Sequence, residues 1–133
     1  MNGRTAYLDS SAFVKLVVNE AESAALRAFL LHWPQRASAA LLRTEAIRAL
    51  RRAGYDNRVG AARRLLAAVR LIRLDEPMLD TAAEMDSRDL RSLDSVHLAA
   101  ASQMGPDLGV FITYDQRLGE AARQRGLLVH APR

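Results

Sequence analysis

Four acidic residues stand at positions from which a folded chain could gather them at one site. They are Asp9, Glu45, Asp94 and Asp115. Asp9 directly follows a short apolar run, and Asp115 follows a second run closely. Clustered carboxylates raise each other's pKa, and a bound Mg²⁺ or Mn²⁺ relieves that repulsion because hard cations prefer oxygen ligands. Such a site can activate water and bridge phosphate oxygens for an in-line displacement.

Each of these acids also has a purely structural interpretation. Asp9 and Asp115 are well placed to cap the helices that follow them. Asp94 falls in a first helical turn, where the helix dipole favours a carboxylate. Glu45 has no capping role, and a glutamate on a solvated helix face is its ordinary explanation. The four positions alone therefore leave both interpretations open.

The elements that would position these acids alternate between strands and helices. Short apolar runs predict strands at residues 6–8, 36–39, 71–74, 110–112 and 127–129. Helical periodicity predicts helices at residues 10–18, 22–33, 40–53, 57–69, 76–87, 93–104 and 116–125, with Ser38 as the N-cap of the third. This alternation indicates a mostly parallel sheet covered by helices on both faces. Ligands of such sheets bind beyond the carboxyl ends of the strands, where Asp9 and Asp115 are expected.

Length and composition limit the classes of function. A chain of 133 residues predicts a single domain spanning residues 1–133. The absence of cysteine excludes disulfides, thiolate metal sites and cysteine nucleophiles. There are 19 basic residues, all but Lys15 arginine, against 15 acidic ones, and setting the four acids aside leaves 11. A basic body around an acidic pocket suits a phosphodiester substrate, although arginine-rich composition alone also explains the charge.

The early apolar stretch at residues 12–18 is the nearest approach to a targeting segment. It contains Lys15 and is too short and polar for a membrane span of about 20 residues. It also lacks the charged start and uninterrupted apolar core of a signal peptide. We therefore expect a cytoplasmic protein without membrane association.

Basic side chains near the acids are further candidates. His97 follows Asp94 by three residues and shares its helix face, so it could be a metal ligand or general base, but we favour a histidine that is packed or that orients a metal ligand from behind. Four arginines in the third and fourth predicted helices could contact RNA or a protein partner, or could simply be solvated. They are Arg51, Arg52, Arg63 and Arg64.

The residues around the four acids resemble a known family. The segment at residues 7–16, YLDSSAFVKL, is similar to the opening of PIN-domain ribonucleases, specifically the VapC toxins of bacterial toxin–antitoxin pairs. Residues 93–101, LDSVHLAAA, resemble that family's third acidic motif, and residues 111–118, FITYDQRL, resemble its fourth. The helix around Glu45 matches the intervening glutamate. The motifs stand in family order and cover essentially the whole chain.

The resemblance implies an α/β fold, a PIN-like and Rossmann-like three-layer sandwich with a mostly parallel sheet of about five strands. It implies a Mg²⁺- or Mn²⁺-dependent endoribonuclease, acting on structured tRNA or rRNA loops. The four acids are then the catalytic and metal-binding residues, with Asp9 and Asp94 as direct ligands and Asp115 acting through water. Thr113 would orient a carboxylate or a metal-bound water.

The resemblance also implies partners. VapC toxins are usually homodimers, and a cognate VapB-like antitoxin inhibits them in a heterotetramer or larger assembly. The apolar and arginine-rich segment at residues 41–66 is the expected contact for such an antitoxin.

Rival functions fit the sequence less well. A haloacid-dehalogenase-type phosphatase needs a second aspartate two residues after the first, where this chain has Ser11. A receiver domain needs a lysine after a late strand, and the only lysine is Lys15. A PIN scaffold that binds RNA or a protein without cleavage remains the alternative, because filled acidic positions do not prove turnover.

Overall fold

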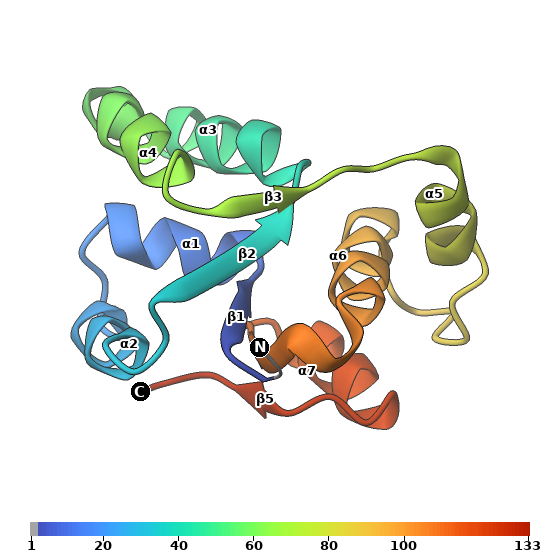
Figure 1. Cartoon of the computed structure of the whole chain (residues 1–133). Helices are drawn as coiled ribbons and strands as arrows, with labels where there is room; N and C mark the ends of the chain where they lie inside the picture. Colours follow the sequence, from blue (N-terminus) through green and yellow to red (C-terminus); the bar gives the residue numbers. More distant parts are fainter. Residues whose placement is uncertain (1–2) are drawn as a thin grey trace.

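A computed structural model describes residues 3–133. Its centre is a five-stranded parallel sheet in the order β3-β2-β1-β4-β5. Figure 1 shows β2 between β3 and β1. The strands are β1 (Thr5–Leu8), β2 (Gln35–Ala39), β3 (Arg70–Ile72), β4 (Leu108–Ile112) and β5 (Val129–His130). The predicted α/β sandwich with a parallel five-stranded sheet is confirmed.

Helices cover both faces of this sheet. One layer contains α1 (Ser10–Val17), α2 (Ser23–Leu30), α3 (Leu42–Arg52) and α4 (Val59–Leu66), the last preceded by the short 3₁₀ helix η1 (Asp56–Arg58). The other layer contains α5 (Glu76–Ala83), α6 (Ser92–Gln103) and α7 (Gln116–Gln124), and the 3₁₀ helix η2 (Gly105–Asp107) precedes β4. None of the helices in residues 3–133 combines the length and the apolar character needed to cross a bilayer.

The alternation of side chains along β1 and β4 sends apolar groups into both layers. Tyr7 and Phe111 pack with α5, α6 and α7, whereas Leu8 and Ile112 pack with α1 and α2. All four side chains are buried, as expected for parallel strands covered on both faces. The two strands are therefore rigid supports for whatever follows them.

The order of the strands determines where on the sheet a site can form. Because β1 lies between β2 and β4, the chain leaves the centre of the sheet first in one direction and later in the other. Such a switch point leaves a crevice beyond the carboxyl ends of the strands. The Asp9 backbone N–H continues the ladder by donating to the Ile112 carbonyl at 3.3 Å. The residues after β1 and β4 therefore emerge side by side.

Some predicted boundaries were wrong. Ser38 lies within β2 and its hydroxyl donates to the Leu8 carbonyl at 2.6 Å, so it does not cap α3, whose N-cap residue Leu41 makes no side-chain bond. The helix predicted at residues 22–33 ends at Leu30, because tight turns follow before Pro34. The last strand begins two residues later than predicted, at Val129, because the Leu127 N–H still donates to the Ala122 carbonyl in the turn that ends α7.

Candidate active site

Asp9 lies at the carboxyl end of β1, where it both caps α1 and faces β4. Its Oδ1 accepts from the Ala12 backbone N–H at 2.9 Å and from the Ser11 hydroxyl at 2.7 Å. Its Oδ2 accepts from the Thr113 hydroxyl at 2.5 Å. Burial raises the pKa of the Asp9 carboxyl, and the hydrogen bonds from Thr113 and Ser11 oppose that rise. Oδ1 already accepts two hydrogen bonds, whereas Oδ2 accepts only one and so retains a lone pair for a cation.

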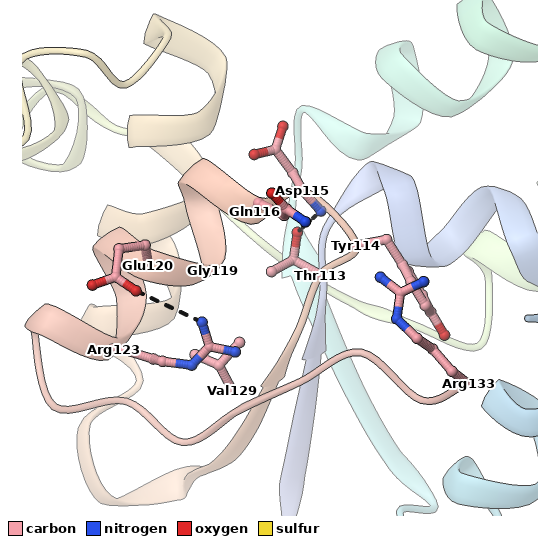
Figure 2. Close-up of a pocket in the computed structure, with 9 residues that line it drawn as sticks. All are labelled: Thr113, Tyr114, Asp115, Gln116, Gly119, Glu120, Arg123, Val129 and Arg133. Carbon is pink, nitrogen blue, oxygen red and sulfur yellow. Dashed lines mark hydrogen bonds and ion pairs between the residues drawn. The ribbon is translucent and has the colours of Figure 1, made fainter.

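Asp115 follows β4 and caps α7. Its Oδ1 accepts from the Leu118 backbone N–H at 3.0 Å, and its own N–H donates to the Thr113 hydroxyl oxygen at 3.0 Å. Thr113 thus connects Asp115 to Asp9. In Figure 2 the Asp115 carboxylate points away from the ion pair of Glu120 and Arg123, which are 3.9 Å apart.

Asp94 lies in the first turn of α6 and is partly buried. Burial raises the pKa of Asp94 first, and the negative charges of Asp115 and Asp9 raise it further. Ser92 is the first residue of α6, and the preceding Arg91 occupies the cap position without a side-chain hydrogen bond. The like charges that act on Asp94 show that acids from β1, α6 and α7 share one electrostatic environment.

Glu45 reaches the same region from α3. Its side chain is 13% exposed, and its Oε1 lies 2.6 Å from Nε2 of His97. His97 is 1% exposed, which fits the packed histidine favoured from the sequence. Glu45 is therefore an inward-facing helical acid and not a residue of a solvated helix face.

An open cleft of about 620 Å³ joins three of the four acids, and we call it the acidic cleft. Its lining residues are Ser10, Leu41, Thr44, Glu45, Arg48, Ala49, Arg52, Arg91, Ser92, Leu93, Asp94 and Asp115. Asp9, which is 3% exposed, does not line the cleft but directly precedes its residue Ser10. A further cavity of about 500 Å³ shares Asp115 and includes Arg123 and Arg133, as Figure 2 shows.

The donor set of the acidic cleft suits a hard divalent cation. Its ligands would be carboxylate oxygens. Burial, and then the charges of Asp115 and Asp9, raise the pKa of Asp94, and a bound cation would oppose that rise. Within residues 3–133, no three acidic or histidine side chains lie close enough together to hold one ion as they stand. The acids therefore surround the cleft without forming a preassembled cage.

Several residues of the site were missed from the sequence. Arg48 and Arg91 line the acidic cleft together with Arg52, whereas Arg63 and Arg64 do not. Arg48 follows Glu45 by three residues on the same helix, and this spacing was an available signal. Nothing local to Arg91 marks it as a cleft residue, because its position depends on how α6 packs against α3.

The fold and the acids at its carboxyl edge define a class of protein, the PIN domain. The PIN-domain family pattern matches residues 6–124. Ribonuclease VapC46 of Mycobacterium tuberculosis is 48% identical over 126 residues, covering 95% of this chain and 96% of that protein. Ribonuclease VapC47 of the same organism is 36% identical over 130 residues, with the same two coverages. The chain belongs to the PIN-domain family, and within it to the VapC ribonuclease toxins.

Solved structures agree with this fold. VapC20 of Mycobacterium tuberculosis, described as a toxin that cleaves the sarcin-ricin loop, has a TM-score of 0.75 at 18% identity. That similarity covers 96% of this chain and 99% of VapC20. A toxin–antitoxin complex from Klebsiella pneumoniae has a TM-score of 0.65 at 20% identity, covering 83% of this chain and 86% of the other. At these identities the likeness concerns the fold alone.

Proposed function

We propose that this protein is a Mg²⁺- or Mn²⁺-dependent endoribonuclease whose catalytic acids are Asp9, Glu45, Asp94 and Asp115. The observation that carries the proposal is the acidic cleft, which is lined by Glu45 of α3, Asp94 of α6 and Asp115, the N-cap residue of α7. An acidic environment built from separate elements is the arrangement a divalent cation would stabilise. The family membership supports the same chemistry.

Each acid has a distinct task in this proposal. The ion, when bound, supplies Lewis-acid chemistry that lowers the pKa of water and offsets charge on the phosphate. Asp9 and Asp94 are the proposed direct ligands. Glu45 contributes a further carboxylate ligand, and Asp115 completes the negative environment with the oxygen that does not cap α7. Thr113 holds Asp9 through Oδ2 and so fixes the orientation of that carboxylate at the carboxyl ends of β1 and β4.

The arginines of the acidic cleft support an RNA substrate. Arg48, Arg52 and Arg91 are exposed and line the same cleft as three of the acids. Guanidinium groups bind phosphate in a bidentate manner, so these side chains suit the backbone on either side of a scissile bond. Structured tRNA or rRNA loops are the proposed substrates, because splayed bases leave the backbone accessible.

The same cleft suits an inhibitory partner. Leu41, Ala49 and Leu93 give it an apolar side, and Leu93 is 50% exposed. We propose a VapB-like antitoxin that covers this surface, and a homodimeric toxin that forms a heterotetramer or larger assembly with it. Co-expression with the product of a neighbouring small reading frame should yield a stable complex, and Leu93→Asp should weaken it. Unchanged complex formation by the folded variant would place the antitoxin elsewhere.

The experiment that tests the enzyme is RNA cleavage by antitoxin-free protein. Total cellular RNA is incubated with the wild type and Mg²⁺ or Mn²⁺, with EDTA and Asp9→Asn as controls. Discrete cleavage that needs the metal and disappears in Asp9→Asn is expected. Intact RNA with folded, metal-loaded protein would contradict the proposal and favour a scaffold that binds without cutting.

A further inference from the structure

A buried chain of polar groups leads from the core to the acidic cleft. The Tyr7 hydroxyl lies 2.7 Å from Nδ1 of His97, and Nε2 of His97 lies 2.6 Å from Oε1 of Glu45. The three residues come from β1, α6 and α3. They are far apart in sequence, so only the folded chain assembles them.

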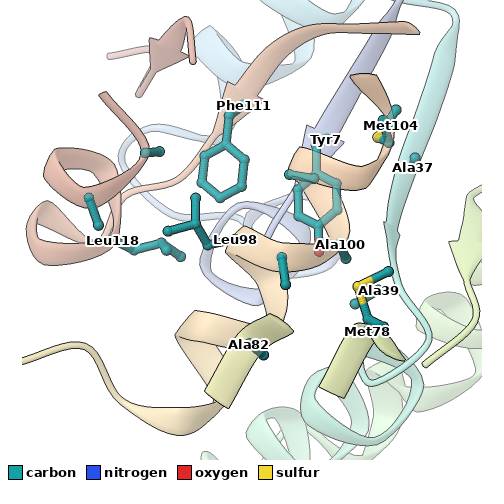
Figure 3. Packing of buried hydrophobic residues seen from close by; sticks show 14 residues of the cluster. Tyr7, Ala37, Ala39, Met78, Ala82, Leu98, Ala100, Met104, Phe111 and Leu118 are labelled. Atoms are coloured by element: carbon teal, nitrogen blue, oxygen red, sulfur yellow. The ribbon is translucent and has the colours of Figure 1, made fainter. Parts of the chain in front are cut away.

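The inner two members of this chain are immobilised by packing. Tyr7 is fully buried and stacks on Phe111, with ring centroids 5.2 Å apart and planes 6° apart. His97 meets the edge of Tyr7 at 82° and 5.7 Å. Figure 3 shows Tyr7 among apolar side chains, including Phe111 and Leu98. The imidazole therefore has a defined position when it reaches Glu45.

The direction of the hydrogen bonds follows from the groups involved. A carboxylate can only accept, so Nε2 of His97 carries the proton that faces Glu45. The Tyr7 hydroxyl, which can donate or accept, is the partner of Nδ1. The two hydrogen bonds together hold the imidazole with Nε2 facing Glu45.

We propose that His97 and Tyr7 are positioning residues that hold Glu45 ready to bind the divalent cation. The inference rests on the proposed function of the acidic cleft. Glutamate has three side-chain torsions, and ordering them costs free energy when a ligand binds. A hydrogen bond to Oε1 fixes these torsions in advance and leaves Oε2 for the cleft that Glu45 lines. Side chains that hydrogen-bond to metal ligands are known to tune the affinity for the metal in this manner.

A purely structural role would not require polar side chains at positions 7 and 97. Tyr7 belongs to an otherwise apolar cluster and His97 packs against its ring, and in such surroundings a well-packed hydrophobic side chain often serves stability equally well. We therefore explain the polar chain by the residue at its outer end, which is Glu45. The two roles can be separated, because packing and hydrogen bonding respond to different substitutions.

The test compares Mn²⁺ affinity with folding in four variants. His97→Phe and Tyr7→Phe remove hydrogen bonding and keep a ring, His97→Gln keeps an N–H near the position of Nε2, and Glu45→Gln removes the acid itself. Mn²⁺ binding is measured by electron paramagnetic resonance, and folding by circular dichroism. We expect His97→Phe to weaken Mn²⁺ binding about 10- to 100-fold. Tyr7→Phe should have a smaller effect in the same direction, and His97→Gln should restore part of the loss.

Nitrogen NMR of the metal-free protein provides a second readout. The wild type should show a hydrogen-bonded proton at Nε2 of His97, and Tyr7→Phe should weaken that signal. Folded His97→Phe protein that binds Mn²⁺ like the wild type would overturn the inference while leaving the metal site intact. A wild type that binds no Mn²⁺ would overturn both this inference and the proposed function. A His97 that carries its proton at Nδ1 alone would overturn this inference only. The surface variant His32→Gln, which changes an exposed histidine, is the matched control.

Discussion

The Thr113 hydroxyl donates a hydrogen bond of 2.5 Å to Oδ2 of Asp9, and this bond joins the carboxyl ends of the two central strands. It connects the acid with the least solvent exposure to the strand that leads to Asp115. A buried carboxylate needs such donors to remain charged. The bond therefore determines both where the Asp9 carboxylate points and how readily it ionises.

Replacing Thr113 by valine should lower both the stability and the activity of the protein. Thr113→Val leaves Oδ2 of Asp9 without its donor, which costs about 1–3 kcal/mol in the free energy of unfolding. The rate of RNA cleavage should fall about 10- to 100-fold, because the ligand loses its orientation. Thr113→Ser keeps the hydroxyl and should retain most of the activity. Equal rates for folded Thr113→Val and wild type would show that the bond has no catalytic role.

Removing the charge of Asp94 should stabilise the metal-free protein. Like charges around the acidic cleft repel with energies on the order of 1 kcal/mol. Asp94→Asn should therefore raise the Tm by about 3–5 °C in EDTA while abolishing metal-dependent cleavage. Saturating Mn²⁺ should reverse the order of the two Tm values. A lower Tm for Asp94→Asn in EDTA would contradict the electrostatic account.

The stability difference between Asp94→Asn and the wild type should depend on pH, because the pKa of Asp94 is raised. The unfolded chain loses this proton near the ordinary aspartate value of 3.8, and the folded chain loses it only at higher pH. The folded state therefore binds more protons between the two values, and stability falls as pH rises through that window. The advantage of Asp94→Asn should be absent below about pH 3.8, grow across the window and then stay constant. Denaturation curves of both proteins at several pH values measure this stability advantage. An advantage that shrinks as pH rises would contradict the prediction.

The arginines of the acidic cleft should govern RNA binding. For the double variant Arg48→Gln with Arg52→Gln, RNA affinity should fall and depend less on salt, since each lost phosphate contact lowers the log–log slope by about 0.7 for a single strand. The double variant Arg63→Gln with Arg64→Gln changes exposed residues of α4 outside the cleft and is the matched control. Filter binding at several salt concentrations measures both. Equal slopes for the two double variants would place the RNA elsewhere.

Substitution by alanine at two glycines should change the stability of the fold in opposite directions. A Cβ at Gly109, in β4, would lie 2.3 Å from both the Gly3 carbonyl oxygen and the Trp33 ring. Gly109→Ala should therefore destabilise the fold by about 1–3 kcal/mol. A Cβ at Gly60, in α4, meets only Arg64 Nη1 at 3.6 Å, so Gly60→Ala should stabilise it by about 0.5–1 kcal/mol. Chemical denaturation of both variants checks the contrast, and similar effects would contradict the close packing of β4.

Much of the fold could be predicted from local patterns, whereas the site needed distant contacts. The apolar runs and caps around Asp9 and Asp115 indicate strands followed by helices, and these elements are confirmed. The misassigned Ser38 shows the limit, because a serine before a helical pattern is a cap only if its hydroxyl is not used elsewhere. The contact between Tyr7 and His97 joins residues 90 positions apart, and no local periodicity encodes it. Strand order and helix packing decide such contacts.

The measurement that tests the central claim most directly is the chemistry of the RNA ends left by the wild type and by Asp94→Asn in Mn²⁺. The account predicts discrete cuts by the wild type with 5′-phosphate and 3′-hydroxyl ends, because water is the nucleophile, and no cuts by the folded variant. Cyclic 2′,3′-phosphate ends would contradict it, because they would show attack by the ribose 2′-hydroxyl. Equal cutting by Asp94→Asn would contradict it as well, because the acids of the cleft would then have no part in the reaction.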